Sequence, residues 1–346
     1  MRIAFFEIQD WEIPLLREKL SEHQLSFHPE KVHETDLGSS QDVEVLSVFI
    51  YSQVRARVLE SLPRLRLIAT RSTGYDQIDT ATCRGRGVEV ATVPSYGENT
   101  VAEHTFALIL ALSRHIHKSY VRVLQGNFSR AGLTGFDLKG RTLGVLGAGR
   151  IGLHVIKIGR GFGMEVLAAD VHQDTFLAEL LNFHYVPVDD LLARSDIITL
   201  HMPYSPATHH FLNAERIARI RKGALLINTA RGALVDTGAL LDALDSGILA
   251  GAGLDVLEGE ELIKEEKQLL TTPLAEEKLR LLLRQHLLTR RDDVVITPHI
   301  AFYSREALRR IVDTTIDNIS SFLAGHPQHV VNPDVLRAGM RQAAGS

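Results

Sequence analysis

Three short groups of polar residues each follow an apolar run, and together they hold the side chains that hydride transfer requires. Arg231 follows Ala-Leu-Leu-Ile, Glu258 and Glu260 follow Gly-Leu-Asp-Val, and His299 follows Val-Val-Ile. A histidine suits proton transfer to or from a hydroxyl group near neutral pH. A carboxylate beside it fixes the histidine tautomer, and the planar guanidinium group of an arginine matches a substrate carboxylate. The three groups therefore predict a site that oxidises or reduces a small acid.

Each of these residues, taken alone, also has a simpler interpretation. Arg231 precedes a glycine and is compatible with a turn cap, and His299 follows a proline and is compatible with an ordinary turn residue. Glu258 and Glu260 are compatible with solvated loop acids. Their shared position after strands favours the functional interpretation, because catalytic groups concentrate on loops that a rigid scaffold positions.

A glycine turn with a spaced acid predicts a dinucleotide-binding unit. The apolar run Thr142–Leu146 leads into Gly147-Ala-Gly149-Arg-Ile-Gly152, and Asp170 follows a second apolar run. Gly147 permits the tight turn, Gly149 lets the backbone approach a pyrophosphate, and Gly152 lets the following helix pack against the strand. The pyrophosphate is then held by the free N–H groups at the helix N-terminus. Asp170 is spaced to accept hydrogen bonds from the adenosine ribose.

The residue types around Asp170 favour NAD over NADP. A carboxylate at this position repels a 2′-phosphate. Val171 and His172 follow it, so no adjacent arginine is available to bind that phosphate. The predicted cofactor is therefore NAD.

Composition bounds the class of protein. The chain has 346 residues, 45% of them hydrophobic and 23% charged, which predicts two globular domains. The net charge of −4 and the lack of a dense basic cluster argue against a nucleic acid or an anionic membrane as partner. The single cysteine, Cys83, excludes an intrachain disulfide, and the start of the chain lacks the pattern of a signal peptide. We therefore expect a cytoplasmic location. The histidines lack metal-ligand spacing, so we expect no metal site.

Strand and helix patterns alternate along the chain, which predicts an α/β fold with two doubly wound parallel sheets. The expected strands of the first part are Ile3–Phe6, Val43–Ile50, Leu67–Thr70 and Val88–Ala91, and its helices are Glu12–Ser21 and Val54–Ser61. The expected strands of the second part are Thr142–Leu146, Glu165–Ala169, Ile197–Leu200, Ala224–Asn228 and Gly251–Val256. A ligand cleft is expected at the carboxyl ends of these strands.

Three other segments carry specific expectations. The run from Asn99 to Ser113 is apolar nearly all round and predicts a helix buried on several sides, as at a domain or subunit interface. The charged, leucine-rich segment 261–291 predicts a solvated amphipathic helix. Residues 304–323 predict a further helix, and the tail 338–346 is expected to fray.

In combination, these motifs resemble the D-isomer-specific 2-hydroxyacid dehydrogenases over nearly the whole chain. The motifs that carry the resemblance are Arg71-Ser-Thr-Gly-Tyr-Asp-Gln-Ile-Asp79, Val93-Pro-Ser-Tyr96, Val101-Ala-Glu-His104, Gly147-Ala-Gly-Arg-Ile-Gly152, His201-Met-Pro203, Asn228-Thr-Ala-Arg-Gly232, Gly253-Leu-Asp-Val256 and Thr297-Pro-His299. The resemblance implies a flavodoxin-like substrate domain, residues 1–99 plus 300–346, and a Rossmann NAD-binding domain, residues 100–299. It also implies a homodimer that pairs through the helix after Asn99.

The resemblance implies a role for each residue of the first three groups. Arg231 resembles the arginine that binds the substrate carboxylate, and His299 resembles the proton donor of the reduction. The catalytic glutamate of the family lies five residues after the aspartate of Gly-Leu-Asp-Val, which selects Glu260 over Glu258. Asp255 resembles the residue that holds the nicotinamide carboxamide.

The resemblance also implies binding residues along both cofactor and substrate. Those of the cofactor are Gly147, Gly149, Arg150, Ile151, Gly152, Asp170, Met202, Pro203, Thr208, Thr229, Ala230 and Asp255. Those of the substrate are Gly74, Tyr75, Tyr96 and Phe302. Two features depart from the family pattern: Tyr75 replaces a smaller aliphatic residue, and the segment between Glu260 and His299 is long.

The expected activity is NAD-dependent reduction of pyruvate to D-lactate by the lactate branch of the family. Within the same class, the alternatives are larger 2-keto acids, glyoxylate, hydroxypyruvate and phosphite. Formate oxidation is disfavoured, because relatives with that activity carry glutamine where Glu260 stands. The alternative from another class is an NADH-sensing binding protein resembling the corepressors that share this fold. The lack of long disordered arms argues against this alternative.

Overall fold

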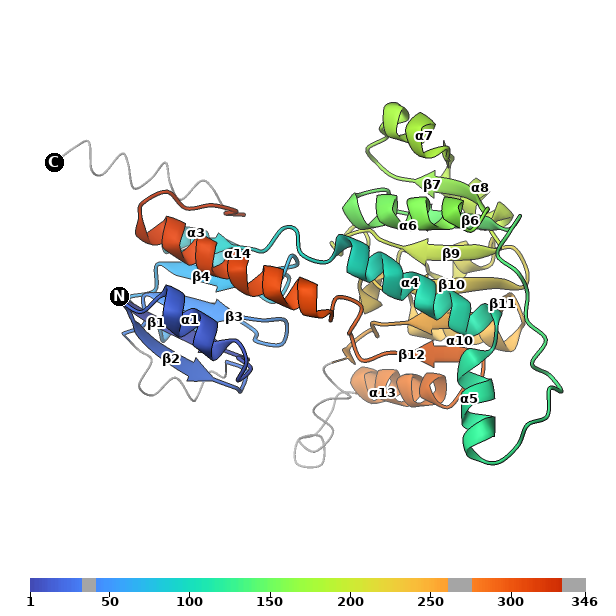
Figure 1. Ribbon diagram of the computed structural model, residues 1–346, viewed down its shortest axis with the longest axis horizontal. Helices are drawn as coiled ribbons and strands as arrows, with labels where there is room; N and C mark the ends of the chain where they lie inside the picture. The colour runs from blue at the N-terminus through green and yellow to red at the C-terminus, as the bar shows by residue number, and fades with distance from the viewer. Residues whose placement is uncertain (33–41, 261–275, 332–346) are drawn as a thin grey trace. The chain divides into compact units, whose positions relative to one another are not determined.

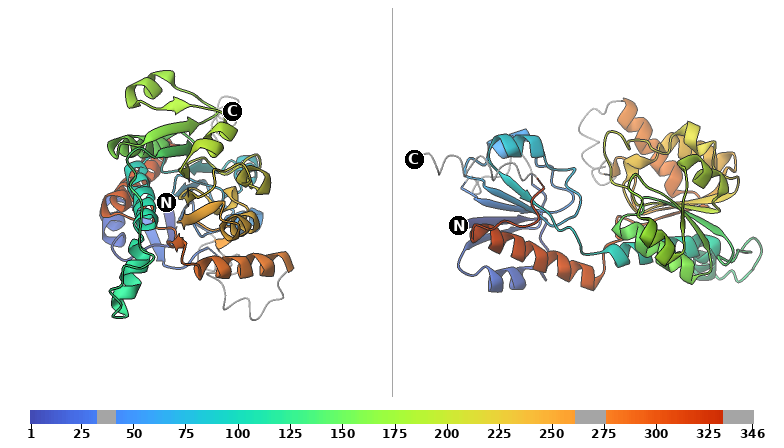
Figure 2. Two further views of the ribbon diagram at one scale, coloured as in Figure 1. Left: turned by 90° about the vertical axis from the view of Figure 1, so that its right-hand side faces the viewer. Right: turned by 90° about the horizontal axis from the view of Figure 1, so that it is seen from above.

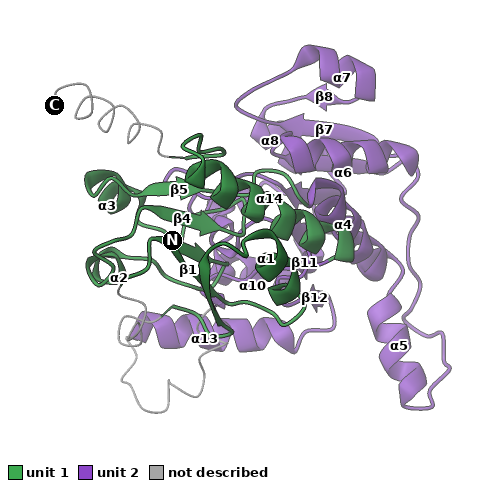
Figure 3. Ribbon diagram, turned by 60° about the vertical axis from the view of Figure 1, so that its left-hand side comes forward, with its two compact units in different colours: residues 1–96, 304–346 green, residues 97–303 purple. Residues whose placement is uncertain are grey.

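The computed structural model describes residues 1–32, 42–260 and 276–331, and in these the chain forms two units (Figures 1 and 3). Unit 1 contains residues 1–96 and 304–346, and unit 2 contains residues 97–303. The sequence placed the domain bounds at residues 99 and 300 instead. The difference has a local cause, because the helix that begins at Glu98 packs within unit 2, and Asp255 of unit 2 holds residues 300 and 301.

Unit 1 is built on a five-stranded parallel sheet with the strand order β2-β1-β3-β4-β5. This is the flavodoxin-like order. Its elements are β1 (Arg2–Phe6), α1 (Ile13–Lys19), β2 (Gln24–His28), β3 (Val45–Val48), α2 (Ala56–Glu60), β4 (Leu67–Thr70), α3 (Thr80–Gly85), β5 (Glu89–Ala91) and α14 (Arg305–Leu323). The predicted strands and helices are present, and β2 and α3 are additional.

Alternation along the strands of unit 1 creates two cores, because successive side chains of a strand point to opposite faces. In β1, Ile3 and Phe5 pack with buried residues of α1 and α14, and Ala4 and Phe6 pack with those of α2 and α3. Cys83 of α3 lies in this second core, and burial raises the pKa of its thiol to about 11. The thiol is therefore protonated at neutral pH.

Unit 2 is built on a seven-stranded parallel sheet with the order β12-β11-β10-β9-β6-β7-β8. Its elements are α4 (Glu98–Ser113), α5 (Ile116–Leu124), β6 (Thr142–Leu146), α6 (Arg150–Gly161), β7 (Glu165–Ala169), α7 (Thr175–Leu181), β8 (His184–Tyr185), α8 (Val188–Arg194), β9 (Ile197–Leu200), α9 (Ala214–Ile217), β10 (Ala224–Asn228), α10 (Thr237–Asp245), β11 (Leu249–Leu254), α13 (Glu276–Thr289) and β12 (Val294–Ile296). Counted from β6, the first six strands run 3-2-1-4-5-6, which is the Rossmann order. The predicted α/β fold with two doubly wound sheets is confirmed.

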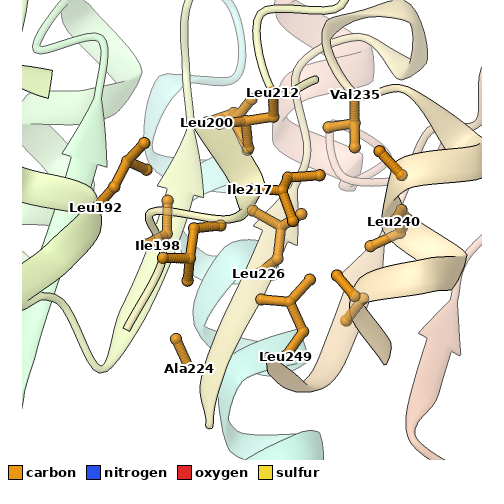
Figure 4. Close-up of a cluster of buried hydrophobic side chains, with 14 of the residues drawn as sticks. Leu192, Ile198, Leu200, Leu212, Ile217, Ala224, Leu226, Val235, Leu240 and Leu249 are labelled. Carbon is orange, nitrogen blue, oxygen red and sulfur yellow. The ribbon is translucent and has the colours of Figure 1, made fainter. Parts of the chain in front are cut away.

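Helices cover both faces of the second sheet. On one face α4 and α6 lie side by side (Figures 1 and 2), and Phe106, Leu108 and Ile109 of α4 are buried against the strands. On the other face, leucine and isoleucine side chains of β9, β10 and α10 form a second core (Figure 4). The long apolar helix is thus largely covered by its own unit.

The charged segment is a helix over Glu276–Thr289, where only Gln285 and Leu288 are buried. The first part of the segment and the tail 338–346 lie outside the described residues. Among the helices of the described ranges, none has the length and apolar character needed to cross a membrane.

Candidate active site

The glycine turn joins β6 to α6 in a conformation that only glycine fits well. Gly147 has φ of +98°, and a Cβ there would lie 2.7 Å from the His201 carbonyl carbon. A Cβ on Gly152 would lie 2.0 Å from the Gly147 carbonyl oxygen. At Gly149, the N-cap of α6, a Cβ would meet no atom within 4 Å. The backbone at the helix N-terminus is therefore uncovered at Gly149, which fits the close approach of a cofactor pyrophosphate.

Asp170 lies at the end of β7 beside this turn. Its Oδ2 accepts a hydrogen bond from the Ala148 N–H at 2.7 Å, and its Oδ1 accepts one from the His172 N–H at 2.9 Å. Both bonds orient the carboxylate and leave lone pairs for a ribose hydroxyl. The adjacent Val171 is 94% exposed and uncharged, so this side chain offers no positive charge to a 2′-phosphate.

A turn after β9 contains the residues predicted for the adenosine side. The Thr208 hydroxyl donates to the Pro203 carbonyl oxygen at 2.9 Å and accepts from the Ser205 N–H at 2.7 Å. Met202, just before this turn, packs against the core of unit 2. Thr208 therefore closes the turn as well as lying in the predicted cofactor region.

Arg231 is presented by a turn that a buried asparagine organises. The Asn228 Oδ1 accepts from the Ala230 N–H at 3.0 Å, and its Nδ2 donates to the Arg231 carbonyl oxygen at 2.9 Å. Thr229 exchanges a hydrogen bond with Thr105 of α4 at 3.0 Å. Asn228 at the end of β10 is only 1% exposed, so its bonds form in a poorly solvated environment.

His299 and Glu260 form the central pair of the site. The distance from His299 Nδ1 to Glu260 Oε1 is 2.7 Å. Because an ionised carboxylate only accepts, the histidine carries its proton on Nδ1, and Nε2 is left to face a reactant. His299 adopts φ of +58°, and its ring meets Phe302 edge to face with the centroids 6.3 Å apart.

Asp255 holds the turn that carries His299. Its two oxygens accept from the Ile300 N–H at 2.9 Å, the Ala301 N–H at 2.8 Å and the Thr297 hydroxyl. The His299 N–H also donates to the Asp255 carbonyl oxygen at 2.9 Å. The residue predicted to contact the nicotinamide thus also fixes the strained backbone of His299.

His104 of α4 extends this network. Its Nε2 lies 3.0 Å from the Thr297 hydroxyl oxygen and 3.5 Å from Asp255 Oδ1. The Thr297 proton points to Asp255, so His104 is the donor in the bond to Thr297. Burial lowers the pKa of His104, and the Asp255 carboxylate only partly opposes this. A neutral His104 therefore buttresses the His299 turn.

Glu258 is not the hydrogen-bond partner of His299. Its Oε1 is 2.6 Å from His210 Nε2, so the two glutamates of the loop each have a different histidine partner.

The substrate residues predicted in unit 1 are Gly74, Tyr75 and Tyr96, which follow β4 and β5. The Ser72 hydroxyl donates to the Gly74 carbonyl oxygen at 2.6 Å, and Arg310 donates to the Tyr96 carbonyl oxygen. Tyr75 is 39% exposed.

His201 follows β9 beside the glycine turn. Its Nε2 lies 2.9 Å from the Thr199 hydroxyl oxygen, and its buried Nδ1 has no hydrogen-bond partner among the residues described. Burial lowers the pKa of His201 to about 3. The folded protein therefore holds this histidine neutral.

We expect His201 to make the protein sensitive to acid. Below about pH 6.5 the unfolded chain takes up a proton on this histidine and the folded protein does not, so stability falls as the pH falls towards 3. Between pH 7 and pH 5, protonation of His201 in the unfolded chain lowers the free energy of unfolding by about 2 kcal/mol. His201→Gln, which keeps a hydrogen-bonding group beside Thr199, should lose that much less stability over the same interval, as measured by urea unfolding at both pH values. Equal losses in the two proteins would contradict this.

Sequence reasoning missed several residues that position the site. His104 and Asn228 stood inside the quoted motifs, but neither was assigned a function. Their roles depend on contacts between segments far apart in the chain, such as the 193-residue separation of His104 and Thr297. Among the described residues, no group of histidine, cysteine, aspartate and glutamate could hold a metal ion.

Comparison with known proteins places this geometry in a family. Residues 106–301 match the family model described as D-isomer specific 2-hydroxyacid dehydrogenase, NAD binding domain. A 2-hydroxyacid dehydrogenase homolog of Haemophilus influenzae is 36% identical over 94% of this chain and 97% of its own length. The D-lactate dehydrogenase of Escherichia coli is 32% identical, over 94% and 98%. A D-lactate dehydrogenase structure from Aquifex aeolicus, complexed with NAD and lactic acid, has a TM-score of 0.85 and 38% identity, and covers 95% of this chain and 99% of that one.

Proposed function

The chain belongs to the D-isomer-specific 2-hydroxyacid dehydrogenases, NAD-dependent oxidoreductases that act on a CH–OH group, and from this premise we propose that it reduces pyruvate to D-lactate. The observation that carries the proposal is the 2.7 Å pair of His299 and Glu260, on loops that follow the last two strands of an NAD-binding sheet. The similarity to D-lactate dehydrogenases over nearly the whole chain supports the choice of substrate.

In the proposed reaction, bound NADH supplies the hydride. His299, protonated at both nitrogens, gives its Nε2 proton to the carbonyl oxygen of the keto acid as the hydride reaches the carbon. Glu260 stabilises the imidazolium and keeps its ring oriented. Arg231 binds the carboxylate through two parallel hydrogen bonds and polarises the neighbouring carbonyl.

The residues of the glycine turn fit the cofactor, because the backbone is uncovered at Gly149, where α6 begins, and Asp170 lies beside the turn. We assign the pyrophosphate to the N–H groups of this turn and the adenosine side to Asp170 and the turn closed by Thr208. The nicotinamide side falls to Thr229, Ala230 and Asp255. The remaining assignments stay predictions: Arg150, Ile151, Met202 and Pro203 for the cofactor, and Gly74, Tyr75, Tyr96 and Phe302 for the substrate.

A panel of keto acids tests the proposed substrate. NADH oxidation would be followed with pyruvate, phenylpyruvate, 2-ketoisocaproate, glyoxylate and hydroxypyruvate, and NAD reduction with phosphite. We expect pyruvate to give the highest kcat/KM. A higher value for another compound would keep the family and overturn the substrate. Tight NADH binding without turnover of any compound would overturn the enzymatic proposal and favour the NADH-sensing alternative.

We also propose that the protein is a homodimer. The sequence predicted an interface on the helix after Asn99, and the exposed apolar residues favour α5, which follows that helix. Most apolar residues of α4 are covered by its own unit, whereas α5 has no buried residue. Ile116, Tyr120 and Leu124 share one face of α5, and Tyr120 and Leu124 are 65% and 69% exposed. Apolar stripes of this kind mark protein interfaces. Analytical ultracentrifugation should therefore give twice the mass of the chain.

The cytoplasmic location stays a prediction.

A further inference from the structure

Glu258 connects several segments of unit 2 through one carboxylate. Its Oε1 accepts from His210 Nε2 at 2.6 Å, and its Oε2 accepts from the Thr237 hydroxyl at 2.7 Å and the Thr237 N–H at 3.3 Å. Its carbonyl oxygen accepts from the Nε2 of Gln285, a buried residue of α13. The loop after β11 is thereby tied to the segment after β9, to the start of α10 and to α13.

The backbone around Glu258 lies directly against the turn that presents Arg231. A Cβ placed on Gly232 would lie 2.0 Å from the Leu257 carbonyl carbon and 2.3 Å from the Glu258 nitrogen. The Glu260 N–H donates to the Leu257 carbonyl oxygen at 3.3 Å, so residues 257–260 form one turn. That turn contacts the Arg231 segment on one side and carries Glu260 at its end.

His210 is itself held firmly in place. Its N–H donates to the Ala233 carbonyl oxygen at 2.8 Å, and its backbone adopts φ of +47°. Its ring stacks on His209 with the centroids 3.9 Å apart, and its Nδ1 lies 3.9 Å from Asp236 Oδ2. The side chain that anchors Glu258 is therefore fixed by its own contacts to the segment that follows Arg231.

We propose that Glu258, anchored by His210 and Thr237, is a positioning residue that sets the places of Arg231 and Glu260. The inference rests on the proposed function, in which those two residues act with His299. Glu258 acts through the turn 257–260 and needs no contact with the substrate. Under this proposal α13 also helps to position the turn, because its Gln285 donates to the Glu258 carbonyl oxygen.

Glu258→Gln tests the proposal with little change in volume. The amide has one oxygen for the donors of His210 and Thr237, and its NH₂ group meets a donor instead of an acceptor. The turn should relax, and a displacement of about 1 Å at a catalytic group costs on the order of 100-fold in rate. We therefore expect kcat with pyruvate to fall by about 100-fold and the Kd for NADH to change far less, since the glycine turn and Asp170, assigned to the pyrophosphate and the adenosine side, follow other strands.

Asp196→Asn is the matched control. Asp196 is also a mostly buried carboxylate with several donors: the Thr142 N–H at 2.9 Å, Arg221 at 2.7 Å and Arg141 at 3.3 Å. It lies just before the amino end of β9, whereas the site residues follow the carboxyl ends of the strands. This variant should lose stability and keep the kcat of the wild type. If both variants lower kcat alike, or if Glu258→Gln lowers only the melting temperature, the proposal is overturned.

A second measurement does not depend on turnover. The His299 Nδ1–H proton bound to Glu260 should give a low-field resonance in the NMR spectrum of the free protein, assigned by its loss in Glu260→Gln. Under the proposal, Glu258→Gln shifts this resonance upfield or removes it, and Asp196→Asn does not. An unchanged resonance in Glu258→Gln contradicts the positioning role. Absence of wild-type turnover with an intact resonance instead overturns the proposed function alone.

Discussion

Replacing His299 with glutamine should lower kcat for keto-acid reduction by about 1,000-fold, the middle of the range for loss of a general acid. Glutamine fills a similar space and keeps a polar end, but its amide cannot deliver a proton to the developing alkoxide. The bond from His299 Nδ1 to Glu260 and the edge contact with Phe302 show that the ring is held for one orientation. The measurement is the steady-state rate of NADH oxidation at saturating pyruvate.

The control for this variant is His154→Gln, which changes an exposed histidine of α6 in the same unit. It should keep the kcat of the wild type, and both variants should bind NADH with unchanged Kd. A His299→Gln protein that retains more than a tenth of the wild-type kcat would remove His299 from the proposed mechanism.

Replacing Arg231 with lysine should lower kcat/KM for pyruvate by about 100-fold, which corresponds to about 3 kcal/mol. Lysine keeps the positive charge but loses the planar fork that forms two parallel hydrogen bonds with a carboxylate. The Asn228 side chain fixes the backbone on both sides of this turn, so the lysine cannot move to compensate. Much of the loss should appear as a raised KM, because the contact is already made in the bound substrate.

Arg219→Lys is the matched change for this experiment. Arg219 is half exposed and pairs with Asp189 and Glu215, on the surface of the same unit. Exposed pairs of this kind contribute little, so its kinetics should be those of the wild type. If Arg231→Lys leaves KM and kcat unchanged, the substrate carboxylate binds elsewhere.

The parts of the fold that sequence could predict are those with a local physical signature. The strand before Gly147, the glycines and Asp170 follow from what a phosphate-binding turn requires, and all of β6, β7, β9 and β10 lie at their predicted residues. In contrast, β2 was missed because Gln-Leu-Ser-Phe-His lacks a clear apolar run. The two-residue strand β8 is too short to produce a pattern.

The sequence could predict which residues form the candidate site, but not which of their side chains are hydrogen-bonded to one another. Arg231, Glu260 and His299 stand after strands, which sequence patterns can locate. Glu258 and Glu260 are both acids of the same loop, and only the fold pairs one with His210 and the other with His299. The family motif selected Glu260 over Glu258, but contacts between loops have no period along the chain, so no sequence pattern could show that Glu258 pairs with His210.

The most direct test of the account is the reaction of the wild-type protein with NADH and pyruvate, with chiral analysis of the product. The account predicts rapid NADH oxidation with one D-lactate formed for each NADH consumed. L-Lactate as the product would mean that the hydride reaches the opposite face of the ketone, which would contradict the predicted orientation of the substrate. NADH binding with no turnover of pyruvate or of any other keto acid would contradict the claim that the His299–Glu260 pair and Arg231 form an active site.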